Sequence, residues 1–91
     1  MIHLIQEIFN DNYFSVISYN ENRCDIVSNN TGHLWSIQYH HNRPHPVCLM
    51  HRRPEESYYH TQWRGFDKNK PIQIIKNHDA WVIELYSLFS H

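Results

Sequence analysis

Residues 13–39, YFSVISYNENRCDIVSNNTGHLWSIQY, decide the fold of this 91-residue chain. The segment holds three stretches that are dense in β-branched and aromatic residues, and short asparagine-rich runs separate them. Asparagine and glycine favour tight turns, so each polar run is expected to reverse the chain. The alternation is clearest where Trp35, Ile37 and Tyr39 share one strand face. The pattern predicts an antiparallel meander with strands over residues 13–19, 23–28 and 33–41.

The same reasoning extends toward both ends of this segment. Residues 1–10 carry apolar side chains at helical spacing, which predicts an amphipathic helix. On the other side, a loop with two prolines leads to residues 47–52, VCLMHR, which predict a fourth strand. Residues 58–63 fit either a fifth strand or an aromatic-rich loop.

The last third of the sequence is ambiguous between helix and strand. Pro71 suits the first turn of a helix, where its missing N–H is not needed. Apolar residues then recur at roughly helical spacing as far as Phe89, although residues 81–89 also alternate as a strand would. We favour the helix, with a break at residues 77–79.

These elements predict a single α+β domain over residues 1–91. An antiparallel sheet of three to five strands would be flanked by an N-terminal and a C-terminal helix, both packed on one face. The other face of the sheet would remain partly open.

Composition narrows the class of protein. A 41% hydrophobic fraction supplies enough material for a core and excludes a disordered chain. Two cysteines, Cys24 and Cys48, do not make a disulfide framework, and we find neither a signal peptide nor an apolar stretch long enough to span a membrane. A cytoplasmic protein is therefore expected. Ten isoleucines and nine asparagines against one alanine indicate an AT-rich genome, which suits a phage or mobile element of a bacterium.

Histidines gather in residues 40–60, HHNRPHPVCLMHRRPEESYYH, which contain five of the nine in the chain. Cys48 and His51 have a C-x-x-H spacing, but on a strand they point to opposite faces and do not share an ion. A His/Cys zinc site across the preceding loop remains an alternative, with the ligands His41, His45, Cys48 and His60. Our expectation is that no metal and no cofactor is bound.

The sequence does not support an enzyme. Cys48 lies among apolar neighbours, where a free cysteine is usually a small core residue and not a nucleophile. Glu55 and Glu56 are adjacent in a loop, and Gly32 and Gly65 stand alone, so neither paired catalytic carboxylates nor a phosphate-binding loop is present.

A basic and aromatic segment is the best candidate for a functional surface. Residues 43–76 carry seven basic against three acidic side chains, whereas the flanking segments are acidic. Arginine, tyrosine and tryptophan are enriched at protein interfaces, and the same residue types suit single-stranded RNA or DNA. The residues predicted to bind a partner are Arg52, Arg53, Tyr58, Tyr59, His60, Trp63 and Arg64.

We rank a protein partner first, nucleic acid second, and consider a homodimer possible. The sequence predicts a small non-enzymatic protein-binding module. The most specific version of this prediction is an inhibitor of a host complex, for example a defence system that acts on nucleic acid. The alternative is a protein that binds single-stranded RNA or DNA through residues 43–70.

Overall fold

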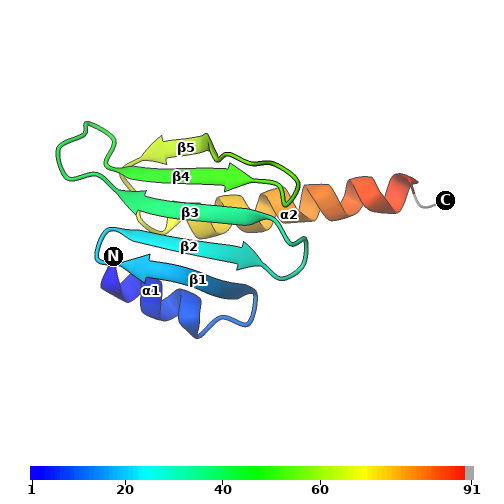
Figure 1. The fold of residues 1–91 in the computed structure, drawn as a ribbon, viewed down its shortest axis with the longest axis horizontal. Coiled ribbons are helices and arrows are strands. Elements are labelled where there is room, and N and C mark those ends of the chain that lie inside the picture. The colour runs from blue at the N-terminus through cyan, green and yellow to red at the C-terminus, as the bar shows by residue number, and fades with distance from the viewer. Residues whose placement is uncertain (90–91) are drawn as a thin grey trace.

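The computed structural model describes residues 1–89, which form one antiparallel five-stranded sheet and two helices, an α+β arrangement as predicted (Figure 1). The strands lie in chain order, so each pairs with the next through a turn or loop. Along the chain the elements are α1 (Ile2–Phe9), β1 (Phe14–Asn20), β2 (Arg23–Ser28), β3 (Leu34–Tyr39), β4 (Val47–Arg52), β5 (His60–Gly65) and α2 (Lys70–Phe89).

The ambiguous parts of the sequence are resolved in favour of regular structure. The stretch near residues 58–63 becomes β5, two residues later than the expected strand. The C-terminal segment is helical, as favoured, but the expected break at residues 77–79 is absent from the continuous helix α2. The helix continues through His78 and Asp79 because their side chains face the sheet, where His78 contacts the His51 ring and Asp79 accepts a hydrogen bond from Thr31.

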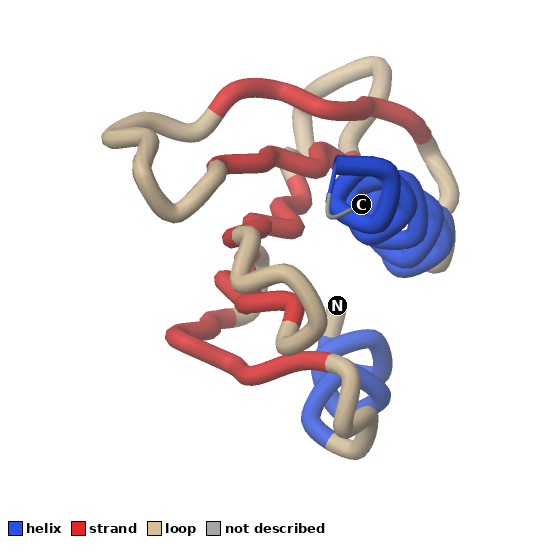
Figure 2. Tube along the Cα trace, turned by 90° about the vertical axis from the view of Figure 1, so that its right-hand side faces the viewer, coloured by secondary structure: helices blue, strands red, loops and turns tan. Residues whose placement is uncertain are grey.

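Both helices pack on the same face of the sheet, as predicted. In Figure 2, α1 lies beside the β1–β2 end of the sheet and α2 lies beside the other strands. The core between these layers comes from alternate strand residues and from the inner faces of the helices. Its fully buried members include Ile8, Ile26, Trp35, Leu49 and Ile75.

The strand register decides which side chains face the helices. Trp35 pairs with Ile26 on β2 and with His51 on β4, so all three point toward the core side. The β4–β5 register shifts at one position, where Gln62 is the extra residue of a bulge. After the shift His60 pairs with His51, so the bulge turns His60 toward the helix side as well.

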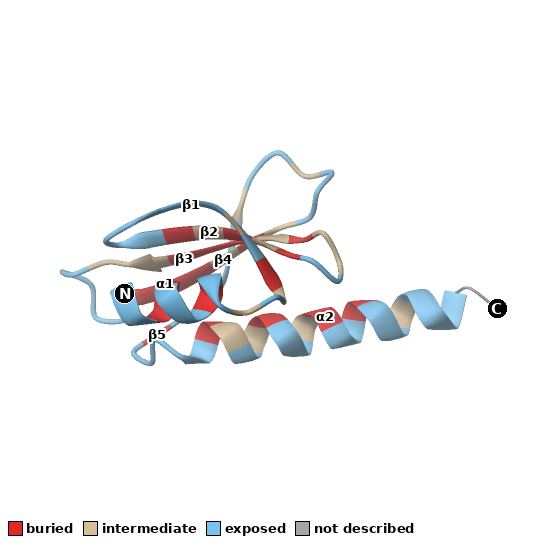
Figure 3. Cartoon of the chain, turned by 90° about the horizontal axis from the view of Figure 1, so that it is seen from below, coloured by how far each residue is buried: buried red, intermediate tan, exposed pale blue. Residues whose placement is uncertain are grey.

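Helix α2 is longer than the sheet beneath it. Its 20 residues span roughly 30 Å at 1.5 Å per residue. The six-residue strands span roughly 20 Å. The C-terminal turns therefore project past the sheet, and they are largely exposed (Figures 1 and 3). Among residues 1–89, neither helix is both long enough and apolar enough to cross a membrane.

Candidate functional site

The residues predicted to bind a partner are divided between the two faces of the sheet. Arg52 follows His51 in β4 and Arg64 pairs with Cys48, so both point to the open face. His60 and the half-buried Trp63 point to the helix face, and Trp63 packs against the core. The register therefore does not place these residues on one shared surface, and the remaining three, Arg53, Tyr58 and Tyr59, belong to the β4–β5 loop.

Two of the three arginines are already occupied by neighbouring groups. Arg52 donates a hydrogen bond to the backbone carbonyl of Glu56, and its guanidinium lies 5.5 Å from the centre of the Tyr59 ring. Arg53 Nε lies 3.1 Å from Glu56 Oε1 and 3.5 Å from Glu55 Oε1. These contacts leave little uncompensated positive charge in the loop.

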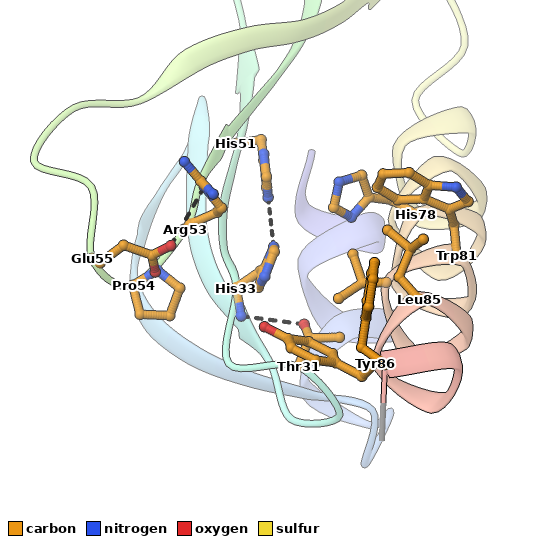
Figure 4. Close-up of a pocket in the computed structure, with 12 residues that line it drawn as sticks. Thr31, His33, His51, Arg53, Pro54, Glu55, His78, Trp81, Leu85 and Tyr86 are labelled. Atoms are coloured by element: carbon orange, nitrogen blue, oxygen red, sulfur yellow. Dashed lines mark hydrogen bonds and ion pairs between the residues drawn. The ribbon is translucent and has the colours of Figure 1, made fainter. Parts of the chain in front are cut away.

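Three histidines that were not predicted as a site meet between the sheet and α2 (Figure 4). His33 precedes β3, His51 lies in β4, and His78 lies on the inner side of α2. One ring nitrogen from each lies within 4.8 Å of those of the other two. His33 Nδ1 and His51 Nε2 are 2.8 Å apart and share a hydrogen bond.

The cluster is buried and tightly packed. His33 is 6% exposed and His51 is 4% exposed, and the buried Nδ1 of His78 has no hydrogen-bond partner among residues 1–89. The Trp35 ring centre lies 4.3 Å from that of His51 and 5.1 Å from that of His78, so the indole fixes both imidazoles. Behind His51, its Nδ1 lies 3.4 Å from Nε2 of His60.

Two imidazoles of the cluster, those of His51 and His78, have lowered pKa values. Burial lowers the pKa of His51 to about 4, with a further contribution from the positive charge that His78, His33 and His60 would carry. Burial, followed by the neighbouring His33, also lowers the pKa of His78. At neutral pH these side chains therefore offer lone pairs and carry no charge.

A buried carboxylate, Asp79, fixes the position of α2 beside the cluster. Asp79 Oδ2 accepts hydrogen bonds from the hydroxyls of Tyr13, at 2.5 Å, and Ser28. Asp79 Oδ1 accepts one at 3.0 Å from Thr31, whose oxygen in turn accepts the backbone N–H of His33. These bonds connect the segment after α1, the β2–β3 turn and α2, so one residue sets the rotation that points His78 inward.

The cluster forms the inner end of a groove of about 410 Å³. One wall is the projecting part of α2, including Trp81 and Leu85, and the other is the start of the β4–β5 loop (Figure 4). Arg53 is the one member of the predicted partner-binding set among the residues that line this groove.

The alternative zinc ligands do not converge. His41 Nε2 bonds to Asn22, the His45 ring packs against Phe66, and Cys48 is buried on the opposite face of β4 from His51. The prediction that Cys48 and His51 point to opposite faces is thus confirmed, as is the burial of Cys48.

Sequence reasoning missed the histidine cluster although two signals were available. His51 shares a strand face with the apolar Val47 and Leu49, so a polar side chain there has to find a partner inside the protein. Asp79 likewise occupies the apolar stripe of α2 between Ile75 and Val82. Each signal concerns a single residue. Only the tertiary fold shows that His51 and Asp79 lie in the same region, between the sheet and α2.

Comparison of the chain with protein-family models, with curated proteins and with solved structures finds no match.

Proposed function

We propose that this chain is a small, non-enzymatic protein-binding module, and that its groove holds an amphipathic helix of a partner protein. The observation that carries the proposal is that the buried stripe of α2 continues beyond the sheet. Ile75, Val82 and Phe89 follow one another at seven-residue spacing, and their exposed fractions are 0%, 8% and 84%. The same helix face that packs on the sheet is therefore left open at its C-terminal end.

The projecting turns carry further apolar side chains. Trp81 and Leu88 are 58% and 68% exposed, and with Leu85 between them they are spaced four and three residues apart. This spacing forms a continuous ridge of the kind that packs against a second helix. Contiguous exposed apolar surface on a protein usually marks an interaction site.

The charges at the groove favour an uncharged, apolar segment. Arg53, the cation on the loop wall, is paired with Glu55 and Glu56. Because these charges compensate one another, the rim offers little attraction to a phosphate and is compatible with apolar side chains. Arg52 is similarly engaged by Glu56 and Tyr59. These contacts support a protein partner over single-stranded nucleic acid.

The biological origin and the target of this module are proposed from the sequence alone. The AT-rich composition favours a cytoplasmic inhibitor carried by a phage or mobile element, with a host complex as its target. The helix in the groove would then belong to a subunit of that complex.

The proposal is tested with tagged protein and lysate of the cells that encode it, with and without nuclease treatment. The groove variant combines L85E and F89E, and the matched control I83E places the same charge on another exposed part of α2. We expect a specific protein to be recovered by the wild type and by I83E, to resist nuclease and to be lost with the groove variant.

A second pair of variants tests the residues predicted from the sequence to bind a partner. Y58A and R64A remove two exposed members of the predicted set without disturbing the core. If these variants lose the partner and the groove variant keeps it, the binding surface lies on the loop and on the open face. If binding disappears with nuclease and weakens steeply with salt, the partner is nucleic acid and the protein-binding proposal is wrong.

A further inference from the structure

We propose that His33, His51 and His78 form a binding site for a divalent transition-metal ion of the zinc class, at the inner end of the groove. The three histidines line the inner end of the groove proposed to hold a partner helix, but they are not part of the ridge formed by Trp81, Leu85 and Leu88. Metal binding can therefore be measured in the absence of a partner.

The convergence of the three side chains is the first argument. They come from the β2–β3 turn, from β4 and from α2, so the fold and not a local motif brings them together. In a tetrahedral zinc site with Zn–N bonds of about 2.0–2.1 Å, ligand nitrogens lie roughly 3.3 Å apart. The observed separations, 2.8 Å for His33 and His51 and at most 4.8 Å for all pairs, bracket that value. Small rotations of the imidazoles would place all three nitrogens at bonding distance.

An unsatisfied polar atom is the second argument. The Nδ1 of His78 is buried and has no hydrogen-bond partner among the described residues. Leaving such an atom unpaired inside the protein costs free energy. Coordination to an ion would remove that cost and would explain why a histidine occupies the inner face of α2.

Supporting contacts around the cluster resemble those that orient metal ligands. A histidine ligand usually directs its second ring nitrogen at another polar group, which fixes its tautomer and orientation. His51 does so toward His60, which leaves its Nε2 on the side of His33 and His78. Trp35 fixes the rings of His51 and His78 by a tilted contact and an edge contact, respectively.

The donor set selects the class of ion. Three imidazole nitrogens suit Zn²⁺, Co²⁺, Ni²⁺ and Cu²⁺, whereas Mg²⁺ and Ca²⁺ require oxygen ligands. The ion would be held by three protein ligands and would face the groove with its remaining position. A water molecule or a donor group of a bound partner would complete the coordination there.

The test uses untagged protein stripped with a chelator and titrated with Co²⁺, whose visible spectrum distinguishes four- and five-coordinate sites from the hydrated ion. H78Q removes one proposed ligand, and the double variant H41Q/H45Q removes two exposed histidines outside the cluster as a matched control. We expect the wild type and the control to bind one equivalent with a low-coordinate spectrum, and excess Mg²⁺ to have no effect. H78Q should lose more than about tenfold in affinity, because loss of supporting contacts alone costs that much.

A second measurement protects the test against a variant that fails to fold. In the wild type, Ni²⁺ or Cu²⁺ bound at the cluster should quench the fluorescence of the adjacent Trp35 in proportion to occupancy, and a chelator should restore it. The proposal is overturned if H78Q, shown to be folded by circular dichroism, binds Co²⁺ as the wild type does. It is equally overturned if H41Q/H45Q abolishes binding, or if the wild type shows no saturable binding.

Discussion

Asp79 connects α2 to two other parts of the chain through hydrogen bonds. It is fully buried, and three hydroxyl groups from two other parts of the chain donate hydrogen bonds to its carboxylate. A buried charge with this many donors is stabilised, but truncating it leaves several donors unpaired at once.

We expect D79A to lower the free energy of unfolding by about 2–4 kcal/mol, because the hydroxyls of Tyr13, Ser28 and Thr31 would lose their common acceptor. Urea denaturation followed by circular dichroism measures the change. E84A, which removes an exposed carboxylate from the same helix, is the control and should change stability by less than about 0.5 kcal/mol. Equal effects of D79A and E84A would refute the anchoring role.

The pKa of His51 predicts how stability depends on pH. Burial lowers this pKa from 6.5 to about 4 in the folded protein, so between these values the unfolded chain binds more protons than the folded one. The free energy of unfolding should therefore fall as the pH falls through this interval, by an amount on the order of 3 kcal/mol at most. Above pH 6.5 this histidine contributes no slope.

Urea midpoints measured from pH 7.5 to pH 4 in chelator-treated buffer would test this dependence. The slope of the wild type should persist in H41Q, whose side chain is exposed, and should be reduced in H51Q. Identical slopes for H51Q and the wild type would show that other groups cause the acid sensitivity.

At the scale of elements, the β5 bulge and the glycine that follows it arrange the strand beside the cluster. The Trp63 indole lies over the Cα of Gly65, and a Cβ at Gly65 would overlap the ring. Because Trp63 packs against the core, it has little room to move aside.

G65A should therefore destabilise the fold by about 1–3 kcal/mol, the usual cost of forcing atoms into a packed region. Thermal unfolding compared with that of T61A, a change on the exposed face of the same strand, provides the measurement. A melting temperature for G65A no lower than that of T61A would contradict the described packing of Trp63.

The elements were predictable to the extent that their signals are local. The alternation of Trp35, Ile37 and Tyr39 and the turn around Gly32, which adopts φ 76°, depend on neighbouring residues. The strands formed within two residues of their expected bounds. The uncertainty over residues 81–89 was physical: the same apolar residues satisfy both periods, and packing on the sheet decides for the helix. The break expected at residues 77–79 was wrong because Asp79 obtains its hydrogen bonds from other parts of the fold.

At the scale of the whole molecule, the candidate site could not be read from spacing. His33 and His51 are 18 positions apart, and His78 lies on another element altogether. The three histidines meet only because of the β3–β4 register, the inward orientation of His51 on β4, and the packing of α2 on the sheet. Only His51 among the five histidines of residues 40–60 belongs to the cluster, since His40, His41 and His45 lie in the β3–β4 loop and His60 lies in β5.

The length of α2 links the two proposals. A helix longer than the sheet leaves an open apolar stripe at its C-terminal end. The apolar wall of the groove, which has the histidine cluster at its inner end, is therefore a consequence of the difference in length between α2 and the strands.

The central claim is that docking of α2 assembles a three-histidine metal site, and imidazole nitrogen NMR on the unmodified wild-type chain tests it most directly. On addition of one equivalent of Zn²⁺ to chelator-treated, ¹⁵N-labelled protein, we predict that one ring nitrogen each of His33, His51 and His78 shifts to a metal-bound value. The imidazoles of His41 and His45 should remain unchanged. Shifts confined to the exposed histidines, or no shift at the cluster, would contradict the account.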